Sequence, residues 1–147
     1  MSLTEKELGD LVRRYYDRAF NHGEFDIVDE IANDDEPFVC DSNAGWAIEG
    51  VAGIKASISR QRHAFKDFTF TIDELFVDGK KVTLWWTATG IFHNRLLEYD
   101  PTGERLTFSG ASLLLFSEND KLIGGRSAAD LQEKLRATAI EPAAVPA

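Results

Sequence analysis

The hydrophobic positions of this chain repeat with helical spacing up to about residue 65 and alternate as in strands after it. Thr4 and Glu7 have the spacing of a capping box, in which each side chain bonds a backbone N–H at a helix start. Asn21–His22–Gly23 is predicted to end this first helix. Similar spacing predicts two more helices, over about residues 25–32 and 50–65. The apolar stripe of the first helix consists of Leu8, Leu11, Val12, Tyr15, Ala19 and Phe20.

From Phe68 onward, apolar and polar residues alternate as in half-buried strands. The alternation changes parity near Asp73–Glu74, which predicts a β-bulge, and Asp78–Gly79 is a strong signal for a two-residue hairpin loop. Residues 128–138 are expected to be helical or coiled, and residues 139–147 to form a disordered tail. The predicted strands cover residues 38–41, 46–48, 68–77, 81–93, 106–117 and 121–127.

Helices that come first and a meander of long strands that follows indicate an α+β fold. We expect a single domain over residues 1–138, in which the N-terminal helices pack on one face of a strongly curved antiparallel sheet. Such an arrangement is a cone-shaped α+β barrel, and a cone has a hollow end. The sequence therefore predicts an interior pocket, apolar and lined by acids, for a small organic molecule.

Composition narrows the classes of partner. The formal charge is -9, and a negative field repels phosphate backbones, so no nucleic-acid partner is expected. Cys40 is the only cysteine, which excludes an intramolecular disulfide and favours a reducing cytoplasm. We expect no signal peptide and no membrane partner, because neither a basic-then-apolar start nor an apolar run of about 20 residues occurs. No phosphate loop, zinc spacing or nucleophile elbow is present, so no cofactor and no metal are predicted.

Five stretches of the chain, in this order, resemble the SnoaL-like polyketide cyclases, within the superfamily of nuclear transport factor 2 and ketosteroid isomerase. They are Val12–Tyr16 with Phe20–Gly23, Glu49–Ile54, Lys81–Gly90, Pro101–Gly103 leading to Ser109–Gly110, and Asp120–Ile123 with Asp130 further on. The resemblance implies a cofactor-free enzyme of secondary metabolism, such as antibiotic biosynthesis, that acts on a hydrophobic polyketide. In ring-closing members a carboxylate in the pocket serves as the general acid/base of an aldol closure, although fold alone does not fix the reaction.

Four residues are candidates for catalysis. Asp130 falls where the resemblance places an acidic residue after the last strand, and burial would raise its pKa toward neutrality. The alternative for Asp130 is a helix N-cap. Asp41 lies in a short strand that in relatives carries a cavity acid or histidine, and its alternative is a solvated turn. His93 could carry a proton or be a surface residue at a strand end. Arg126, on the inward side of the last strand, could stabilise an enolate or pair with an acid.

Six residues are candidates for binding the substrate. Ser112 shares a strand face with Leu114 and could donate a hydrogen bond to a substrate carbonyl. The others are aromatic and are candidates for lining, with plain core packing as the alternative. The set is Tyr16, Trp46, Trp86, Phe92, Ser112 and Leu114.

Two functions follow. The first is a cyclase or isomerase that moves protons with Asp130 or Asp41, or that works mainly by folding its substrate. The second is a non-catalytic small-molecule-binding or dimerisation module on the same fold. A homodimer is expected in which a strand face pairs with its copy, and the residues of this face are Thr83, Trp85, Thr87 and Thr89.

Overall fold

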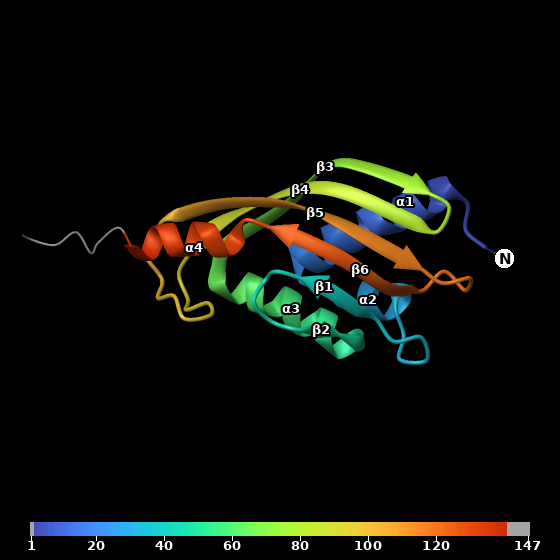
Figure 1. Cartoon of the computed structure of the whole chain (residues 1–147), viewed down its shortest axis with the longest axis horizontal. Coiled ribbons are helices and arrows are strands. Elements are labelled where there is room, and N and C mark those ends of the chain that lie inside the picture. Colours follow the sequence, from blue (N-terminus) through green and yellow to red (C-terminus); the bar gives the residue numbers. More distant parts are fainter. Residues whose placement is uncertain (1, 141–147) are drawn as a thin grey trace, which may run out of the picture.

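The computed structural model describes residues 2–140 and has a helical layer folded over one curled sheet (Figure 1). The helical elements are α1 (Glu5–Tyr15), a π-helical segment η1 (Tyr16–Asn21), α2 (Asp26–Ile31), α3 (Gly50–Ala64) and α4 (Leu131–Ile140). The strands are β1 (Val39–Ser42), β2 (Ile48–Glu49), β3 (Phe65–Asp78), β4 (Lys81–Phe92), β5 (Arg105–Phe116) and β6 (Leu122–Ala129). Within this described part, no helix is long and apolar enough to cross a membrane.

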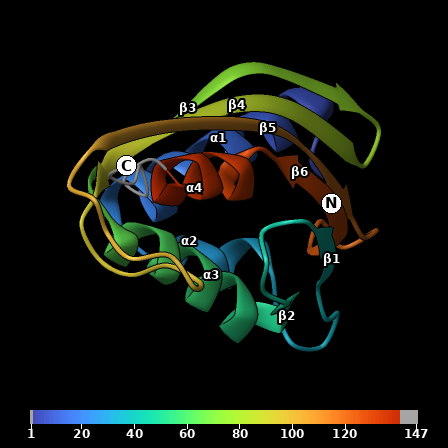
Figure 2. The ribbon, with the colours of Figure 1, turned by 60° about the vertical axis from the view of Figure 1, so that its left-hand side comes forward.

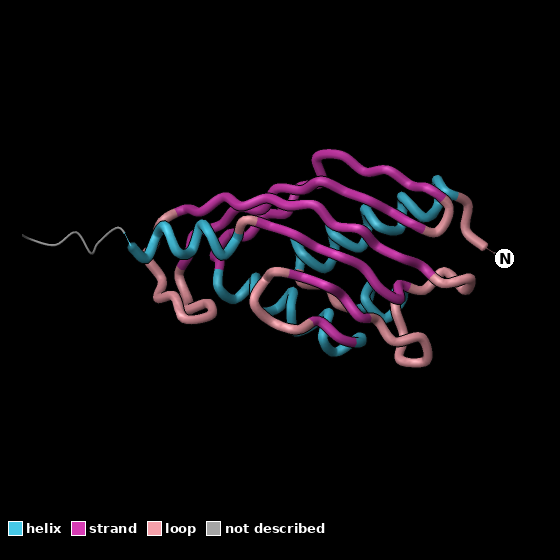
Figure 3. The backbone as a smooth tube through the Cα atoms, in the orientation of Figure 1, coloured by secondary structure: helices cyan, strands magenta, loops and turns pink. Residues whose placement is uncertain are grey.

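The strands form one sheet in the order β2-β1-β6-β5-β4-β3. All neighbours are antiparallel except β1 and β6, which run parallel. The tube in Figure 3 shows the long strands bending together, so that the sheet curls without closing into a barrel. Seen from its end in Figure 2, the sheet arches over α1, α2 and α3. The α+β cone expected from the sequence is therefore the observed fold.

The first helix begins with the predicted capping box: Glu7 N–H donates to the Thr4 hydroxyl, and Thr4 N–H donates to the Glu7 carboxylate. The helix then widens into η1, a π-turn that the sequence did not indicate. Because of this turn, the adjacent Tyr15 and Tyr16 are both buried. At its end, the Asn21 side chain exchanges two hydrogen bonds with the backbone of Phe70 in β3. These bonds fix the helix to the sheet.

The bulge predicted near Asp73 is present, because the pairing of β3 with β4 shifts between Ile72 and Glu74. The hairpin loop is displaced by one residue from the prediction. Asp78 still pairs with Lys81, so the loop is Gly79–Lys80. Its first residue, Gly79, has φ 61°. A turn that needs positive φ at this position favours glycine, which sets the register.

The C-terminal boundary also differs from the prediction. Strand β6 continues through Ala129, so α4 starts at Leu131 rather than at residue 128. Residues 139–140, expected in a disordered tail, belong to α4. The rest of that predicted tail, residues 141–147, lies outside the described residues.

We predict that two adjacent glycines of β6 differ sharply in their tolerance of a methyl group. A Cβ added at Gly125 would lie 2.3 Å from the Leu113 carbonyl oxygen, whereas one at Gly124 would lie no closer than 3.4 Å to any neighbour. Gly125→Ala should lower the free energy of unfolding by about 1–3 kcal/mol, as overpacking does. Gly124→Ala should change it by less than about 1 kcal/mol. Urea denaturation measures both, and equal effects would contradict the prediction.

Candidate functional site

A cavity of about 100 Å³ lies between the concave face of the sheet and the helical layer. One wall is formed by β4, β5, β6 and β1, and the opposite wall by α1, η1 and α3. Most of this surface is hydrocarbon or aromatic, which suits an apolar organic molecule. The wall consists of Tyr15, Tyr16, Phe20, Phe38, Cys40, Ser42, Asn43, Ala44, Trp46, Ile48, Ile54, Ser57, Ile58, Gln61, Phe70, Trp86, Phe108, Ser112, Leu114, Leu122, Arg126, Ser127, Ala129 and Leu131.

Stacked aromatic rings connect the helical layer to the sheet. The Tyr16 ring lies nearly parallel to the Phe70 ring, with centroids 4.7 Å apart and planes 6° apart. Phe70 stacks in turn on Trp86 at 5.0 Å, and Trp86 meets Phe108 edge-on at 6.0 Å. Such pairs add to the energy of simple burial. The stack makes this part of the cavity wall stiff.

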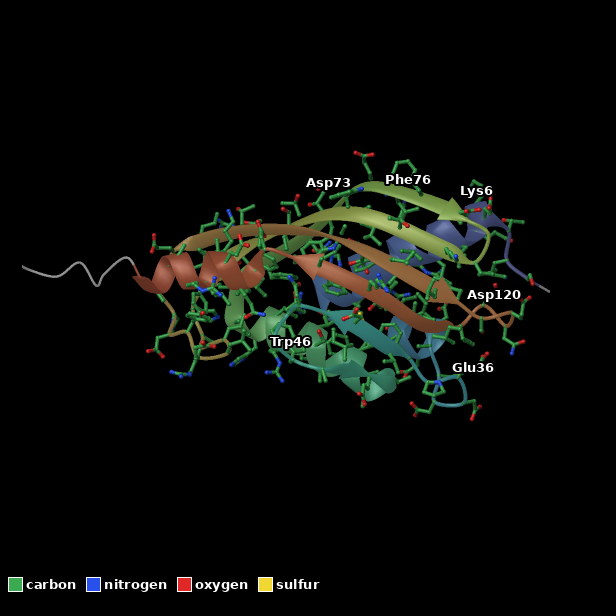
Figure 4. All side chains as sticks on the ribbon, in the orientation of Figure 1. Lys6, Glu36, Trp46, Asp73, Phe76 and Asp120 are labelled. Carbon is green, nitrogen blue, oxygen red and sulfur yellow. The ribbon has the colours of Figure 1, made fainter. Side chains whose placement is uncertain are left out.

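The polar atoms of the wall are mostly hydroxyls and indole N–H groups. On the sheet side, Trp86 Nε1–H donates to Ser112 Oγ at 3.0 Å, and Ser112 Oγ lies 3.0 Å from Ser127 Oγ. On the helix side, Trp46 Nε1–H donates to Ser57 Oγ at 2.9 Å. The labelled Trp46 in Figure 4 lies next to α3. The cationic Arg60 covers the Trp46 ring, with its guanidinium carbon 5.0 Å from the ring centroid.

Two phenols contribute hydroxyls to the cavity wall, and the Tyr16 hydroxyl lies near Ser112. Tyr15 is 5% exposed and Tyr16 is 7% exposed, and both line the cavity. Burial raises the pKa of each phenol well above its ordinary range, and in Tyr16 the nearby Ser112 hydroxyl offsets a small part of the rise. Both groups therefore stay neutral around pH 7 and can donate a hydrogen bond to a bound ligand.

Cys40 lies in the same wall and is half-buried. Burial raises the pKa of its thiol, and the neighbouring Asp41 charge raises it further. The thiol is therefore neutral at pH 7 and is a weak nucleophile.

No aspartate or glutamate lines the cavity, so the expectation of an acid-lined pocket was wrong. Asp130 lies outside, between Ala129 and Leu131, which do border it. Its carboxylate accepts a 2.8 Å hydrogen bond from Ser109 N–H and so extends the pairing of β6 with β5. Its carbonyl accepts from Lys134 N–H at the start of α4. The side chain thus holds the end of the sheet, and the helix-capping alternative applies only to the backbone of Asp130.

Arg126 and Asp41 lie on the outer face of the sheet. Both are exposed, and Arg126 pairs in register with Asp41 on one side and Leu113 on the other. Simple alternation from the buried Leu122 would place Arg126 inward. The register shift at Ile123 reverses the parity, so Arg126 turns outward and Ser127 inward. Both Arg126 and Asp41 border a shallow outer hollow of about 410 Å³. Arg126 also borders the inner cavity, so it lies between the two hollows.

The other candidates divide between wall, core and surface. His93 is exposed just after β4, and its backbone N–H donates to Ala64. Phe92 is fully buried against Phe65 and lies in the core rather than in the cavity wall. The remaining five predicted binding residues all lie in the wall: Tyr16, Trp46, Trp86, Ser112 and Leu114.

Several wall residues were missed by the sequence analysis. Helical spacing placed Tyr15 in the core and did not indicate that it lines a cavity. No local signal marked the π-helical segment that follows it. Ser127 and Ser42 depend on the bulge at Ile123 and on the parallel register of β1 with β6. That register joins segments far apart in sequence, and local patterns do not encode it. Among the residues described, no cluster of three or more metal-ligating side chains occurs.

A curled sheet that arches over helices and encloses an apolar cavity defines a cone-shaped α+β protein. The chain belongs to the SnoaL-like polyketide cyclase family, whose model matches residues 10–138. No curated protein matches the chain.

Solved structures share the fold. A candidate SnoaL-like polyketide cyclase from Jannaschia sp. CCS1 is 22% identical, with a TM-score of 0.79 and coverage of 99% of this chain and 98% of that one. A candidate polyketide cyclase from Acidithiobacillus ferrooxidans is 23% identical, with a TM-score of 0.75 and coverage of 96% and 99%. IdmH, a candidate polyketide cyclase from Streptomyces antibioticus, is 19% identical, with a TM-score of 0.71 and coverage of 89% and 96%.

We predict that the two candidate acids are dispensable for ligand binding. Asp130→Asn and Asp41→Asn should bind 1-tetralone, a small aromatic ketone, with wild-type affinity, because neither carboxylate lines the cavity. Asp130→Ala should instead lower the free energy of unfolding by about 1 kcal/mol, since it removes the acceptor of Ser109 N–H. Titration of tryptophan fluorescence and urea denaturation measure the two effects. A tenfold loss of affinity or of turnover in Asp130→Asn, at unchanged stability, would restore Asp130 as a catalytic acid.

Proposed function

We propose that this protein is a cofactor-independent cyclase or isomerase for a hydrophobic polyketide-type substrate. The observation that carries the proposal is an apolar cavity whose wall offers neutral hydroxyl donors and no carboxylate. Membership of the SnoaL-like cyclase family supports the class of reaction.

The wall favours catalysis by folding the substrate. Holding a flexible chain with its reacting atoms in contact lowers the barrier to reaction by several kcal/mol. A β-dicarbonyl substrate already populates its enol, so the enol carbon attacks an internal carbonyl as a carbon–carbon bond forms. The enol proton moves to the oxygen of the attacked carbonyl, and the enol oxygen becomes a ketone. This aldol closure needs no carboxylate base, and a pericyclic or oxa-Michael closure needs none either.

The hydroxyls of Tyr15, Tyr16 and the serines on the sheet side of the wall stabilise the negative charge that develops on the attacked carbonyl oxygen. A neutral donor in an apolar site interacts more strongly with a developing oxyanion than with a neutral carbonyl. The pKa values of the two phenols are raised by burial, which keeps their protons available for this interaction.

The absence of a wall carboxylate also favours a second candidate, a non-catalytic module that binds the same kind of molecule. Both candidates require the cavity to be occupied. They differ in turnover: the enzyme should accelerate ring closure of a poly-β-ketone, and the binding module should retain the open chain unchanged.

We predict that filling the cavity abolishes binding. Ala129 lines the cavity, and the next residue back, Ala128, is exposed on the outer face of the same strand. Ala129→Phe should weaken binding of 1-tetralone at least tenfold and stop any ring closure, whereas Ala128→Phe should bind as the wild type does. Tryptophan fluorescence gives the affinities, and circular dichroism shows that both variants are folded. Equal affinities in the two variants would place the ligand elsewhere and contradict the proposed function.

We also propose that a second copy of the chain covers the outer face of the sheet. Trp85 is 55% exposed, Phe76 is 57% exposed and Val39 is 61% exposed. In Figure 4 the labelled Phe76 projects from β3 on the side away from the helices. Arg126 and Asp41 pair in register on adjacent strands. The ion pairs found among the described residues do not include one between these two side chains. A twofold axis would let the Arg126 of each copy face the partner's Asp41.

We expect the wild-type protein to sediment as a homodimer. Trp85→Glu should shift it to monomer, because the substitution places a charge in an apolar contact. Thr102→Glu, in the exposed loop before β5, is the matched control and should stay dimeric. Sedimentation equilibrium measures the mass. A wild-type protein that sediments as a monomer at 100 µM would contradict the proposed homodimer.

A further inference from the structure

A row of three serines crosses the inner face of the sheet on adjacent strands: Ser112 on β5, Ser127 on β6 and Ser42 on β1. Ser112 pairs with Ser127 in register, and Ser127 pairs with Ser42. All three line the cavity. We call this set the serine row. Serines are unusual in an otherwise apolar wall. The acceptor that each hydroxyl proton uses therefore decides which polar groups of a ligand the wall can bind.

Both ends of the serine row are held by groups that can only donate. At one end, the indole Nε1–H of Trp86 donates to Ser112 Oγ at 3.0 Å. At the other, the backbone N–H of Ala44 donates to Ser42 Oγ at 3.1 Å. Each terminal serine is therefore an acceptor toward its end of the row, and its own proton must go elsewhere.

The proton of Ser112 goes to Ser127. Ser112 is buried, its Oγ lies 3.0 Å from Ser127 Oγ, and the Tyr16 phenol also lies near it. The reverse direction would leave the buried Ser112 O–H only the phenol oxygen, which is a poorer acceptor than an alkyl hydroxyl, and this is costly. Ser127 is half-buried and borders the cavity, so its proton can reach a ligand.

The number of hydroxyl protons not used within the serine row gives the number of hydrogen-bond donors that it offers to a ligand. Each hydroxyl has one proton, and only the Ser112 proton is used within the row. Apart from Ser112 Oγ, whose own proton is directed at Ser127, no acceptor of a hydrogen bond from the Ser127 or Ser42 hydroxyl is present in the described part of the chain. The row therefore presents two O–H donors to the cavity, with the oxygen of Ser127 already accepting from Ser112.

We propose that the serine row is a subsite for an acceptor oxygen of the ligand, a ketone or enolate oxygen, bound by the hydroxyls of Ser127 and Ser42. Ser112 is a positioning residue that acts through Ser127. The inference rests on the proposed function, because it requires the cavity to hold an apolar organic molecule. It adds selectivity: the site favours a ligand with a carbonyl over the same skeleton without one.

The test compares 1-tetralone with tetralin, which has the same bicyclic skeleton and no carbonyl. Ser127→Ala should weaken binding of 1-tetralone about fivefold, the factor that corresponds to about 1 kcal/mol of hydrogen bonding. It should change the affinity for tetralin less than twofold. The matched control is Ser57→Ala, which removes a buried hydroxyl from the opposite wall and should affect the two ligands equally.

Infrared spectroscopy of bound 1-tetralone tests the contact in the wild type, whatever the stability of the variants. The carbonyl stretch should lie at lower frequency than in hexane, and Ser127→Ala should reverse much of the shift. An unshifted band in the wild type would overturn the serine-row subsite, as would equal losses for both ligands in Ser127→Ala. If neither ligand binds the wild type, the proposed function fails together with the subsite. If both bind and Ser127→Ala changes neither affinity nor band, only the subsite fails.

Discussion

The curl of the long strands decides what each side chain of this protein can do. Because β3, β4 and β5 bend together over the helical layer, one face of every strand is withdrawn from water and the other is left in it. The inner face carries the stacked aromatic rings of Tyr16, Phe70 and Trp86, and these rings line the cavity. Charge and hydroxyl placement follow from the same division.

The alternation of side chains along each strand decides which chemical groups face the cavity and which face the solvent. A single extra residue at Ile123 reverses the facing of all of β6 beyond it, so that a cation goes outward and a serine goes inward. Strand β1 lies parallel to β6 and carries the same alternation, with Asp41 outside and Ser42 inside. The outer face thereby gains opposite charges beside exposed aromatic rings, and the inner face gains hydroxyls, with Arg126 bordering the cavity as well. One bulge thus separates a surface suited to a partner from a cavity suited to a ligand.

Local signals in the sequence were sufficient to predict most helices and strands, but they were insufficient to predict which residues line the cavity. The capping box at Thr4 and the bulge at Asp73 depend on neighbouring residues, and both were predictable. Trp86 and Ser112 could be placed in the wall from alternation alone, since β4 and β5 pair without interruption there. Arg126 could not, because its facing depends on the bulge at Ile123, and the adjacent Gly124 and Gly125 do not fix the residue at which the register shifts. Asp130 looked like a pocket acid because of its place after the last strand, yet a hydrogen bond to Ser109 decides its orientation.

Three ionisable side chains of the cavity wall stay neutral, and Arg126 is the charged residue that borders the cavity. Burial raises the pKa values of Tyr15, Tyr16 and Cys40, so each keeps its proton at neutral pH. A wall carboxylate would repel an enolate formed beside it, and it would need a raised pKa of its own to act as an acid. Neutral donors avoid this repulsion, and they bind a carbonyl weakly and its oxyanion strongly. A substrate that brings its own acidic proton, as a β-dicarbonyl does, needs no more from the protein than this difference and a fixed shape.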